Sequence, residues 1–260
     1  MISILMPVHK NDEYLLLAVD SVLRQTYSEF ELLILANGDE KELIKKTIEK
    51  RFTDERIKVF TLNISQLPFI LNYGVEKSKG EYIARMDGDD ICLETRLEEQ
   101  LEYLNENKLD FLGSDYDLID DQGSLIRHEV TNHDFETIKK RLVIGNQFCH
   151  PSVLMRKSSI IKSKGYSFGF FSEDYELWIR MVFEHGLKGE NINRTLLQYR
   201  IHDGQATNKY NRRRNFAYAI SLSVLSWLKY RKVSFLLSAI WQFNFVKKAY
   251  FTIKRVRNGN

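Results

Sequence analysis

Three carboxylates lie within four positions in the segment Asp87-Gly88-Asp89-Asp90, directly after the β-prone run Glu81–Met86. Alternate residues of a strand share a face, so the side chains of Asp87 and Asp89 can point the same way. Gly88 lets the backbone approach a ligand closely. Carboxylate oxygens at this spacing suit Mg²⁺ or Mn²⁺, which keep positions open for phosphate oxygens. Taken alone, the segment also fits a solvated acidic turn that caps the next helix.

The chain around this segment alternates apolar strands with amphipathic helices. The predicted strands are Ile2–Val8, Phe30–Asp39 with its glycine turn, Ile57–Leu62, Glu81–Met86 and Asp110–Tyr116. The predicted helices are Asn11–Tyr27, Glu40–Phe52, Ser65–Gly80 and Thr95–Asn107. Asn11 or Asp12 is the expected N-cap of the first helix, and Gly80 is expected to close the third.

This alternation predicts an α/β fold, a Rossmann-like and mostly parallel sheet flanked by helices. Ligands of such sheets bind at the carboxyl ends of the strands. We therefore expect the loops after Val8, Ala36 and Met86 to converge on one crevice. From about Asp115 onward, short strands mix with helices, which fits an acceptor or lid region built onto the same sheet.

Six segments in this order resemble the family 2 glycosyltransferases, which are inverting enzymes with the GT-A fold. The segments are residues 3–27 (SILMPVHKNDEYLLLAVDSVLRQTY), 31–39 (ELLILANGD), 78–91 (SKGEYIARMDGDDI), 150–157 (HPSVLMRK), 172–181 (SEDYELWIRM) and 199–207 (YRIHDGQAT). The resemblance covers residues 1–207. It implies a catalytic domain over 1–207, with a nucleotide-sugar-binding half (1–115) and an acceptor-binding half (116–207).

The resemblance also implies a nucleotide-diphosphate sugar as donor and Mn²⁺ or Mg²⁺ bridging its phosphates. The residues that it places against the donor are Pro7, Val8, His9, Asn37, Asp39, Arg85, Asp87, Gly88 and His150. Asn37 stands where the family usually has the aspartate that reads the base. An amide offers a donor and an acceptor, so uracil or thymine could still be read. Arg85 would lie near the phosphates, unless it makes only a salt bridge at the strand edge.

By the same resemblance, Asp89 is the principal metal ligand, and Asp87 contacts the ribose or the metal. His202 would complete the metal site or contact the diphosphate, although a single loop histidine can also be incidental. Asp90 is assigned no ligand role, because the N-cap of the following helix is the interpretation that we favour for it.

Inverting transfer needs a carboxylate that takes the proton of the acceptor hydroxyl. The resemblance makes Asp174 this base and Glu173 its neighbour, at the start of an amphipathic helix. The alternative is that both only complement the helix dipole. His150, Pro151 and Ser152 would line the donor or acceptor sugar pocket, or else form an ordinary loop before a strand.

The charge of the chain is unevenly distributed. The net charge is +3, yet residues 204–260 hold twelve Lys or Arg and no Asp or Glu. The C-terminal tail, residues 208–260, contains two apolar runs, Asn215–Leu228 and Val233–Val246. Each run is shorter than the ~20 residues of a membrane-spanning helix. Basic and aromatic residues beside apolar runs favour a helix pair on an anionic membrane surface. Helices that pack on the catalytic domain are the alternative, and no RNA-binding motif is present.

The resemblance implies a hexosyltransferase that uses UDP-Glc or UDP-Gal and, by inverting an α-linked donor, forms a β-linkage. The expected acceptor is a polyprenyl-diphosphate-linked saccharide of bacterial surface polysaccharide, of the O-antigen or capsule type. The expected location is the cytoplasmic face of the cell membrane, because the chain opens without a signal-peptide pattern and its two cysteines form no disulfide framework.

Three other classes compete with this interpretation. A sugar-nucleotide pyrophosphorylase would need a Gly-rich basic loop after the first strand, and residues 7–14 (PVHKNDEY) have none. An aspartyl-phosphate phosphatase carries its paired aspartates on the first strand rather than the fourth. A non-catalytic scaffold subunit is suggested by Asn37, but the four remaining key residues, Asp87, Asp89, Asp174 and His202, argue against it.

Overall fold

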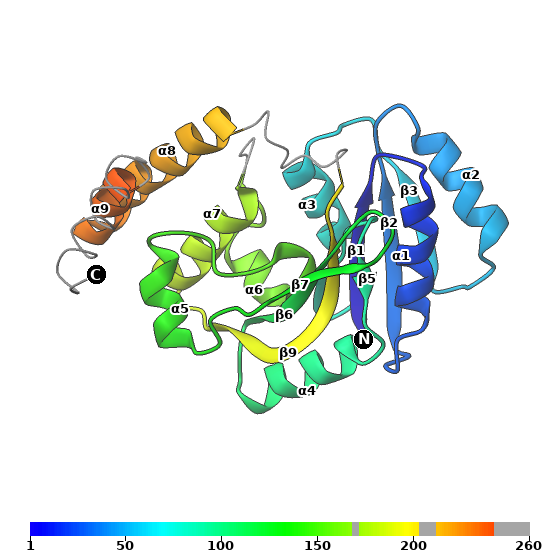
Figure 1. Cartoon of the computed structure of the whole chain (residues 1–260), viewed down its shortest axis with the longest axis horizontal. Helices are drawn as coiled ribbons and strands as arrows, with labels where there is room; N and C mark the ends of the chain where they lie inside the picture. The colour runs from blue at the N-terminus through cyan, green and yellow to red at the C-terminus, as the bar shows by residue number, and fades with distance from the viewer. Residues whose placement is uncertain (168–171, 203–211, 242–260) are drawn as a thin grey trace.

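The computed structural model describes residues 1–167, 172–202 and 212–241. Its strands form one nine-stranded sheet in the order β3-β2-β1-β4-β8-β6-β9-β5, with β7 paired to β6 (Figure 1). The first four strands are β1 (Ile2–Val8), β2 (Phe30–Ala36), β3 (Ile57–Thr61) and β4 (Tyr82–Arg85). They run parallel to one another. The predicted α/β fold with a parallel sheet in its first half is therefore confirmed.

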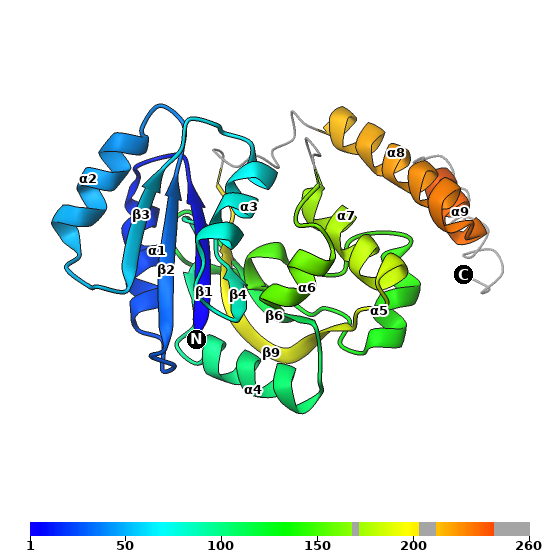
Figure 2. The same cartoon turned by 180° about the vertical axis from the view of Figure 1, so that it is seen from behind.

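Helices cover both faces of this parallel part. They are α1 (Glu13–Leu23), α2 (Lys41–Arg51), α3 (Leu67–Lys77) and α4 (Arg96–Glu106). Asp12 is the N-cap of α1, since its side chain accepts a hydrogen bond from the Leu15 N–H at 3.2 Å. Figures 1 and 2 show α1 and α3 on opposite faces of the sheet.

Strand periodicity explains why both faces are apolar. Ile4 and Met6 of β1 point into the hydrophobic cluster that contains α1, α2 and α4, whereas Leu5 points into the cluster that contains α3. All seven residues of β2 are buried. A strand covered by helices on both sides is expected to be largely apolar, and six of the seven residues of β2 are apolar. The exception, Glu31, accepts hydrogen bonds from Ser3 Oγ at 2.6 Å and Lys58 Nζ at 2.5 Å.

The second half of the chain extends the sheet with antiparallel and parallel partners. Its strands are β5 (Ile91–Cys92), β6 (Phe111–Ile119), β7 (Leu125–Glu129), β8 (Leu154–Arg156) and β9 (Gly189–Arg200). Its helical elements are α5 (Phe135–Leu142), the 3₁₀ turn His150–Ser152, α6 (Lys157–Lys162), α7 (Glu173–Ile179) and the π-helical turn Arg180–Glu184. β8 pairs antiparallel with both β4 and β6, and so joins the two halves. The long strand β9 runs along β6 and ends beside β5, next to the acidic segment.

The last described helices form a hairpin, α8 (Arg212–Tyr230) and α9 (Val233–Trp241), at the end of the molecule opposite α2 (Figures 1 and 2). Phe235 is fully buried, and its ring lies 5.2 Å from that of Phe183. Lys229 Nζ lies 2.5 Å from Glu184 Oε2. The hairpin therefore packs on the π-helical turn, which agrees with the alternative interpretation that the tail helices pack on the catalytic domain. Residues 242–260, which include the end of the second predicted apolar run, lie outside the described residues.

A search of the described helices for a segment that is both long and apolar enough to span a bilayer finds none.

The sequence predicted that Gly80 closes α3, and this prediction is wrong. The helix ends at Lys77, three residues earlier. Gly80 instead lies against the start of β1, where its N–H donates to Ser3 Oγ at 2.8 Å. A Cβ on Gly80 would lie 2.7 Å from Ser3 N and 2.9 Å from Met1 O. The missing side chain is needed for this close approach of two backbones.

We expect Gly80→Ala to lower the free energy of unfolding by ~1–3 kcal/mol, because the backbone atoms it would meet cannot rotate away. Urea denaturation followed by circular dichroism measures the change. Gly145→Ala is the matched control, since no atom lies within 4 Å of its added Cβ, and a change within about 0.5 kcal/mol is expected there. Equal stabilities of the two variants would contradict the packing argument.

Candidate active site

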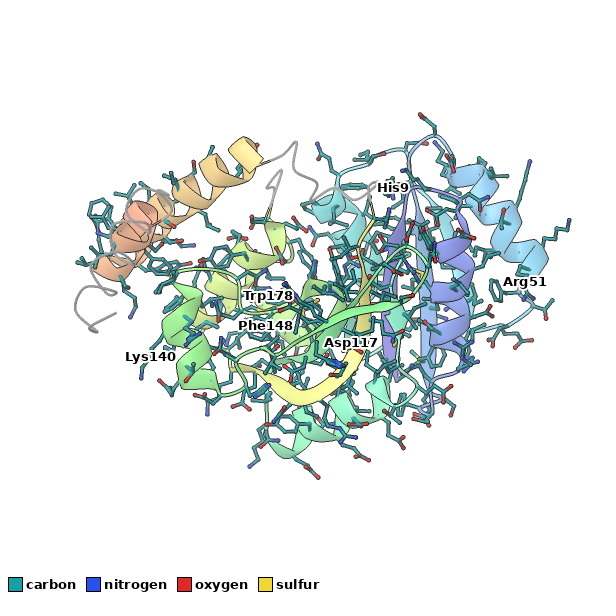
Figure 3. The ribbon with its side chains drawn as sticks, in the orientation of Figure 1. His9, Arg51, Asp117, Lys140, Phe148 and Trp178 are labelled. Atoms are coloured by element: carbon teal, nitrogen blue, oxygen red, sulfur yellow. The ribbon has the colours of Figure 1, made fainter. Side chains whose placement is uncertain are left out.

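The loops after β1, β2 and β4 meet at one edge of the sheet, as predicted. The Asn37 N–H donates to the Val8 carbonyl at 2.8 Å. A Cβ on Gly38 would lie 3.6 Å from His9 O, and one on Gly88 would lie 3.1 Å from Val8 Cγ2. His9 is exposed at the end of β1 (Figure 3). Pro7 and Val8, by contrast, are the last two residues of that strand.

The amide of Asn37 is oriented by the backbone around it. Its Nδ2 donates to the carbonyls of Val8 at 2.9 Å and Leu35 at 3.3 Å. Both of its N–H donors are thus engaged by carbonyls, so Oδ1 is the atom that can serve a ligand as an acceptor. Asp39, two residues on, is exposed.

Asp87, Asp89 and Asp90 form one cluster, and one ligand atom from each lies within 4.8 Å of the others. Asp90 is fully buried. Its Oδ1 accepts a hydrogen bond from the Arg200 N–H at 2.9 Å, while Oδ2 has no hydrogen-bond partner among the described residues. Burial, together with the charges of Asp87 and Asp89, raises the pKa of Asp90 well above its ordinary value.

The N-cap interpretation of Asp90 is therefore wrong, because α4 begins at Arg96 and its N-cap is Thr95. The alternative of a solvated acidic turn also fails for this residue. A carboxylate that has no contact with solvent cannot belong to a solvated turn, and it needs partners inside the protein.

Arg85 is the positive group among these carboxylates. Its side chain is only 4% exposed, and Nη1 lies 2.6 Å from Asp87 Oδ1. Arg85 is an interior cation rather than a strand-edge salt bridge. Burial raises the pKa of Asp87, the Arg85 charge opposes this, and the net direction is upward.

His202 lies beside the acidic cluster, as the resemblance implied. Its Nε2 is 2.9 Å from Asp89 Oδ2. The ring of Tyr14 lies 5.3 Å from the imidazole, centroid to centroid. β9 ends two residues before His202, so the strand carries this histidine to the acidic segment.

These residues fit a divalent cation. Asp90 Oδ2 is a buried carboxylate oxygen without a partner, and two further carboxylates and an imidazole stand beside it. Carboxylate oxygens are the donors that Mg²⁺ and Mn²⁺ prefer, and Mn²⁺ also accepts imidazole. The cation would offset the carboxylate repulsion that, after burial, raises the pKa values of Asp87 and Asp90.

Arg200 is a site residue that the sequence analysis missed. Its backbone N–H binds Asp90, and its Nε donates to the Asp89 carbonyl at 2.9 Å. Nη1 donates to the Asp120 carbonyl at 2.9 Å, and the guanidinium lies 4.6 Å from the centroid of the Tyr14 ring. The residue fixes the backbone of the acidic segment. Its position two residues before His202, in a segment already singled out, was the available signal.

A second carboxylate cluster lies at the start of α7. Asp174 Oδ2 accepts a hydrogen bond from Asn146 Nδ2 at 2.6 Å. Glu173 Oε1 lies 3.9 Å from His150 Nδ1, and His150 Nε2 is 2.9 Å from the Tyr166 hydroxyl. Burial, then the charge of Asp174, raises the pKa of Glu173 to about 7. Burial also raises the pKa of Asp174.

Helix-dipole complementation alone does not explain this pair. Carboxylates that serve only a helix N-terminus remain solvated, whereas the side chain of Glu173 is 13% exposed. Buried carboxylates with raised pKa values are typical of groups that exchange a proton near neutral pH.

Arg85 connects the two clusters. Its backbone N–H donates to the Val153 carbonyl at 2.9 Å, directly after the turn that holds His150. Its charge lowers the pKa values of Glu173 and Asp174 against the larger effect of burial. For His150, burial and the Arg85 charge both lower the pKa. The arrangement can hold a cation and a polyanion on one side and accept a proton on the other.

Comparisons with known proteins agree with this geometry. The family model described as Glycosyl transferase family 2 matches residues 3–163. The O-antigen biosynthesis glycosyltransferase WbnJ of Escherichia coli is 42% identical over 249 residues, which are 94% of this chain and 95% of that protein. The putative glycosyltransferase EpsE of Bacillus subtilis is 29% identical and covers 91% of this chain and 84% of its own.

The fold is similar to that of a solved structure. The crystal structure of S. aureus TarS 1–349 in complex with UDP-GlcNAc superposes with a TM-score of 0.67 at 14% identity. The match covers 86% of this chain and 65% of that one. This likeness supports the fold that the sequence predicted.

The raised pKa of Glu173 makes a prediction about stability. A carboxyl with a folded-state pKa of about 7 and an ordinary value near 4.5 binds more protons when folded. The free energy of unfolding should therefore fall as pH rises between these two values. We expect Glu173→Gln to be more stabilising at pH 8 than at pH 5, by about 1–3 kcal/mol.

Urea denaturation of both proteins at the two pH values measures this difference. Glu81→Gln is the matched control, since the side chain of Glu81 is 73% exposed, and its effect should not change with pH. An effect of Glu173→Gln that is independent of pH would contradict the assigned environment.

Proposed function

Because this chain belongs to glycosyl transferase family 2, we propose that its two carboxylate clusters serve one inverting, metal-dependent glycosyl transfer. The observation that carries the proposal is the buried Arg85, whose charge acts both on the acidic cluster Asp87–Asp90 and on the half-buried pair Glu173–Asp174. One cluster suits a cation and a diphosphate, and the other suits a general base.

The proposed donor is a UDP-hexose, UDP-Glc or UDP-Gal. The TarS structure named above holds UDP-GlcNAc, which supports a nucleotide sugar of this class. Asn37 would read uracil by accepting its N3–H on Oδ1, the oxygen that the backbone contacts leave available. Pro7, Val8 and His9 would lie against the base and ribose. Because Asn37 still offers this acceptor, its presence does not favour a scaffold without a donor site.

In the proposed reaction, the oxygen of an acceptor hydroxyl bonds to the anomeric carbon as the bond to the UDP oxygen breaks. Asp174 takes the hydroxyl proton, and Asn146 holds its carboxylate in place. Arg85 would face the charge of the diphosphate, and the charge of Asp174 helps to keep the pKa of Glu173 raised. A bound Mg²⁺ or Mn²⁺, held by Asp87, Asp89, Asp90 and His202, would neutralise charge on the leaving phosphates. Single displacement of an α-linked donor gives a β-linkage.

The proposed acceptor is a polyprenyl-diphosphate-linked saccharide in O-antigen synthesis. The name of the E. coli relative, which is similar over 94% of this chain, supports O-antigen synthesis. Residues 1–115 would bind the donor, residues 116–207 the acceptor, and the tail 208–260 would bring the enzyme to the cytoplasmic membrane surface.

The hairpin α8–α9 has a surface that suits such a membrane. Leu225, Leu228, Val233 and Leu237 are between 47% and 62% exposed. Lys229, Arg231 and Lys232 lie in and beside the turn between the two helices and are exposed. Exposed leucines beside basic residues are typical of helices that lie on an anionic leaflet.

The reaction is tested with Asp174→Asn and Asp89→Asn. Loss of the general base should lower the rate of transfer by at least about 100-fold. Asp89→Asn should lower it similarly and raise the Mn²⁺ concentration needed for half-maximal rate. UDP release from UDP-Glc and UDP-Gal, with and without Mn²⁺, is the measurement. Glu106→Gln, an exposed carboxyl of α4, is the control, and an Asp174→Asn variant with normal transfer would refute the base assignment.

The membrane surface is tested by sedimentation of the full chain with phosphatidylglycerol vesicles. Leu237→Gln combined with Arg231→Glu and Lys232→Glu should weaken binding at least about tenfold, given ~1 kcal/mol per basic residue at an anionic surface. Leu43→Gln combined with Lys45→Glu and Lys46→Glu, on α2 at the other end of the molecule (Figure 1), is the matched control. Equal loss in both variants, or no loss in either, would exclude this hairpin face as the membrane contact.

A further inference from the structure

An open pocket of about 210 Å³ lies between β6, the segment after β7 and the segment before the turn at His150. Tyr116, Thr131, Asn132, Asn146, Gln147 and Cys149 are among the residues that line it. We infer that this pocket is the acceptor subsite for a single uncharged pyranose ring and that Asn146 couples the bound ring to the base. The inference rests on the glycosyl transfer proposed above.

The chemistry of the wall suits a neutral sugar. Among the described residues that line the pocket, none is an Asp, Glu, Lys, Arg or His. The wall offers carboxamides and hydroxyls, which both donate and accept and so can match ring hydroxyls. Two carboxylates lie beside the wall. Asp115, which also contacts His133 Nε2 at 3.0 Å, accepts hydrogen bonds from the Thr131 N–H and hydroxyl at 2.7 Å, and Asp174 accepts one from Asn146. Repulsion from Asp115 and Asp174 therefore disfavours an acidic sugar.

The wall is held in place before any sugar arrives. Asn132 Nδ2 donates to Gln147 Oε1 at 2.8 Å, and Gln147 Nε2 donates to the Gly145 carbonyl at 2.8 Å. The buried Asn191 donates to the carbonyls of Asn132 and Gln147 at 2.8 and 3.0 Å. Such a preformed polar surface loses little entropy on binding.

The pocket borders the carboxylate pair at the start of α7. Asn146 lines it and donates to Asp174 Oδ2 at 2.6 Å, so a ring that contacts Asn146 lies next to the base. Cys149 lines it as well. The next residue along the chain, His150, has its Nδ1 3.9 Å from Glu173 Oε1.

The volume is suited to one ring. Pockets for drug-sized ligands span roughly 300–1,000 Å³, so about 210 Å³ accommodates the terminal sugar and not the chain behind it. Because the pocket opens to solvent, the remainder of a lipid-linked saccharide can leave through its mouth.

The subsite is tested with p-nitrophenyl glycosides of neutral hexoses and with the matching hexuronides, in the presence of UDP and Mn²⁺. Saturation-transfer NMR should detect a neutral glycoside and give at least tenfold weaker binding for its hexuronide. Asn132→Ala and Tyr116→Phe should each weaken binding of the neutral glycoside by about fivefold or more. Gln122→Ala, an exposed residue outside the pocket, is the control. If no neutral glycoside binds, or if the pocket variants bind as the wild type does, the subsite is refuted.

The role of Asn146 as a positioning residue is tested by measuring kcat against pH for the wild type and for Asn146→Ala. Its hydrogen bond lowers the pKa of Asp174 against the effect of burial. Asn146→Ala should therefore move the acidic limb of kcat for transfer to higher pH, whereas a purely structural loss would lower kcat evenly at all pH values. An unshifted limb would overturn the coupling.

Hydrolysis of the donor without acceptor separates the two proposals. If UDP-Glc and UDP-Gal are neither hydrolysed nor bound, the glycosyl transfer itself is wrong. If the donor is hydrolysed while the pocket variants bind glycosides normally, only the acceptor subsite is wrong.

Discussion

The site depends on one buried cation, the guanidinium of Arg85, among more carboxylates than it can neutralise. Its closest contact is Asp87, while Asp90, Glu173 and Asp174 also lie within its field. Removing charges from water is costly unless each is paired. The pKa values of all four carboxyls are raised, which shows that one guanidinium does not offset the burial. Neutral side chains of similar size are often as stable as a buried charge cluster or more so, and stability alone therefore does not explain this one.

The fold keeps this arrangement in place by backbone contacts from several strands. Arg85 ends β4, where its carbonyl accepts a hydrogen bond from Nη2 of the buried Arg96 at 2.9 Å. Arg200 ends β9 and binds the backbone of the acidic segment from the other side. The two halves of the chain meet through β8, so the clusters face each other only when the whole sheet has formed. Site geometry and global folding are consequently coupled.

Features that depend on local sequence were predictable, and features that depend on close tertiary contacts were not. The strands of the first half, the N-cap Asp12 and the convergence of three loops follow from periodicity and from the topology of parallel sheets. The role of Gly80 depends on a backbone 77 residues away, and the burial of Asp90 depends on Arg200, 110 residues away. Nothing in the local sequence of either residue contains this information. The short strand β5 was missed for the same reason, since two residues become a strand only by pairing with β9.

One half of the site offers charged groups and the other half offers neutral groups, and the two halves therefore suit different parts of the substrates. The acidic cluster and Arg85 offer charged groups, which suit a cation and a diphosphate but distinguish sugars poorly. The pocket beside Asn146 offers only neutral donors and acceptors, which distinguish sugars by the positions of their hydroxyls. Asn146 belongs to both, because it lines the pocket and its amide donates to the carboxylate of Asp174, the proposed base. A hydroxyl that is correctly placed for recognition is thereby also placed for deprotonation, and selectivity and rate become properties of the same contact.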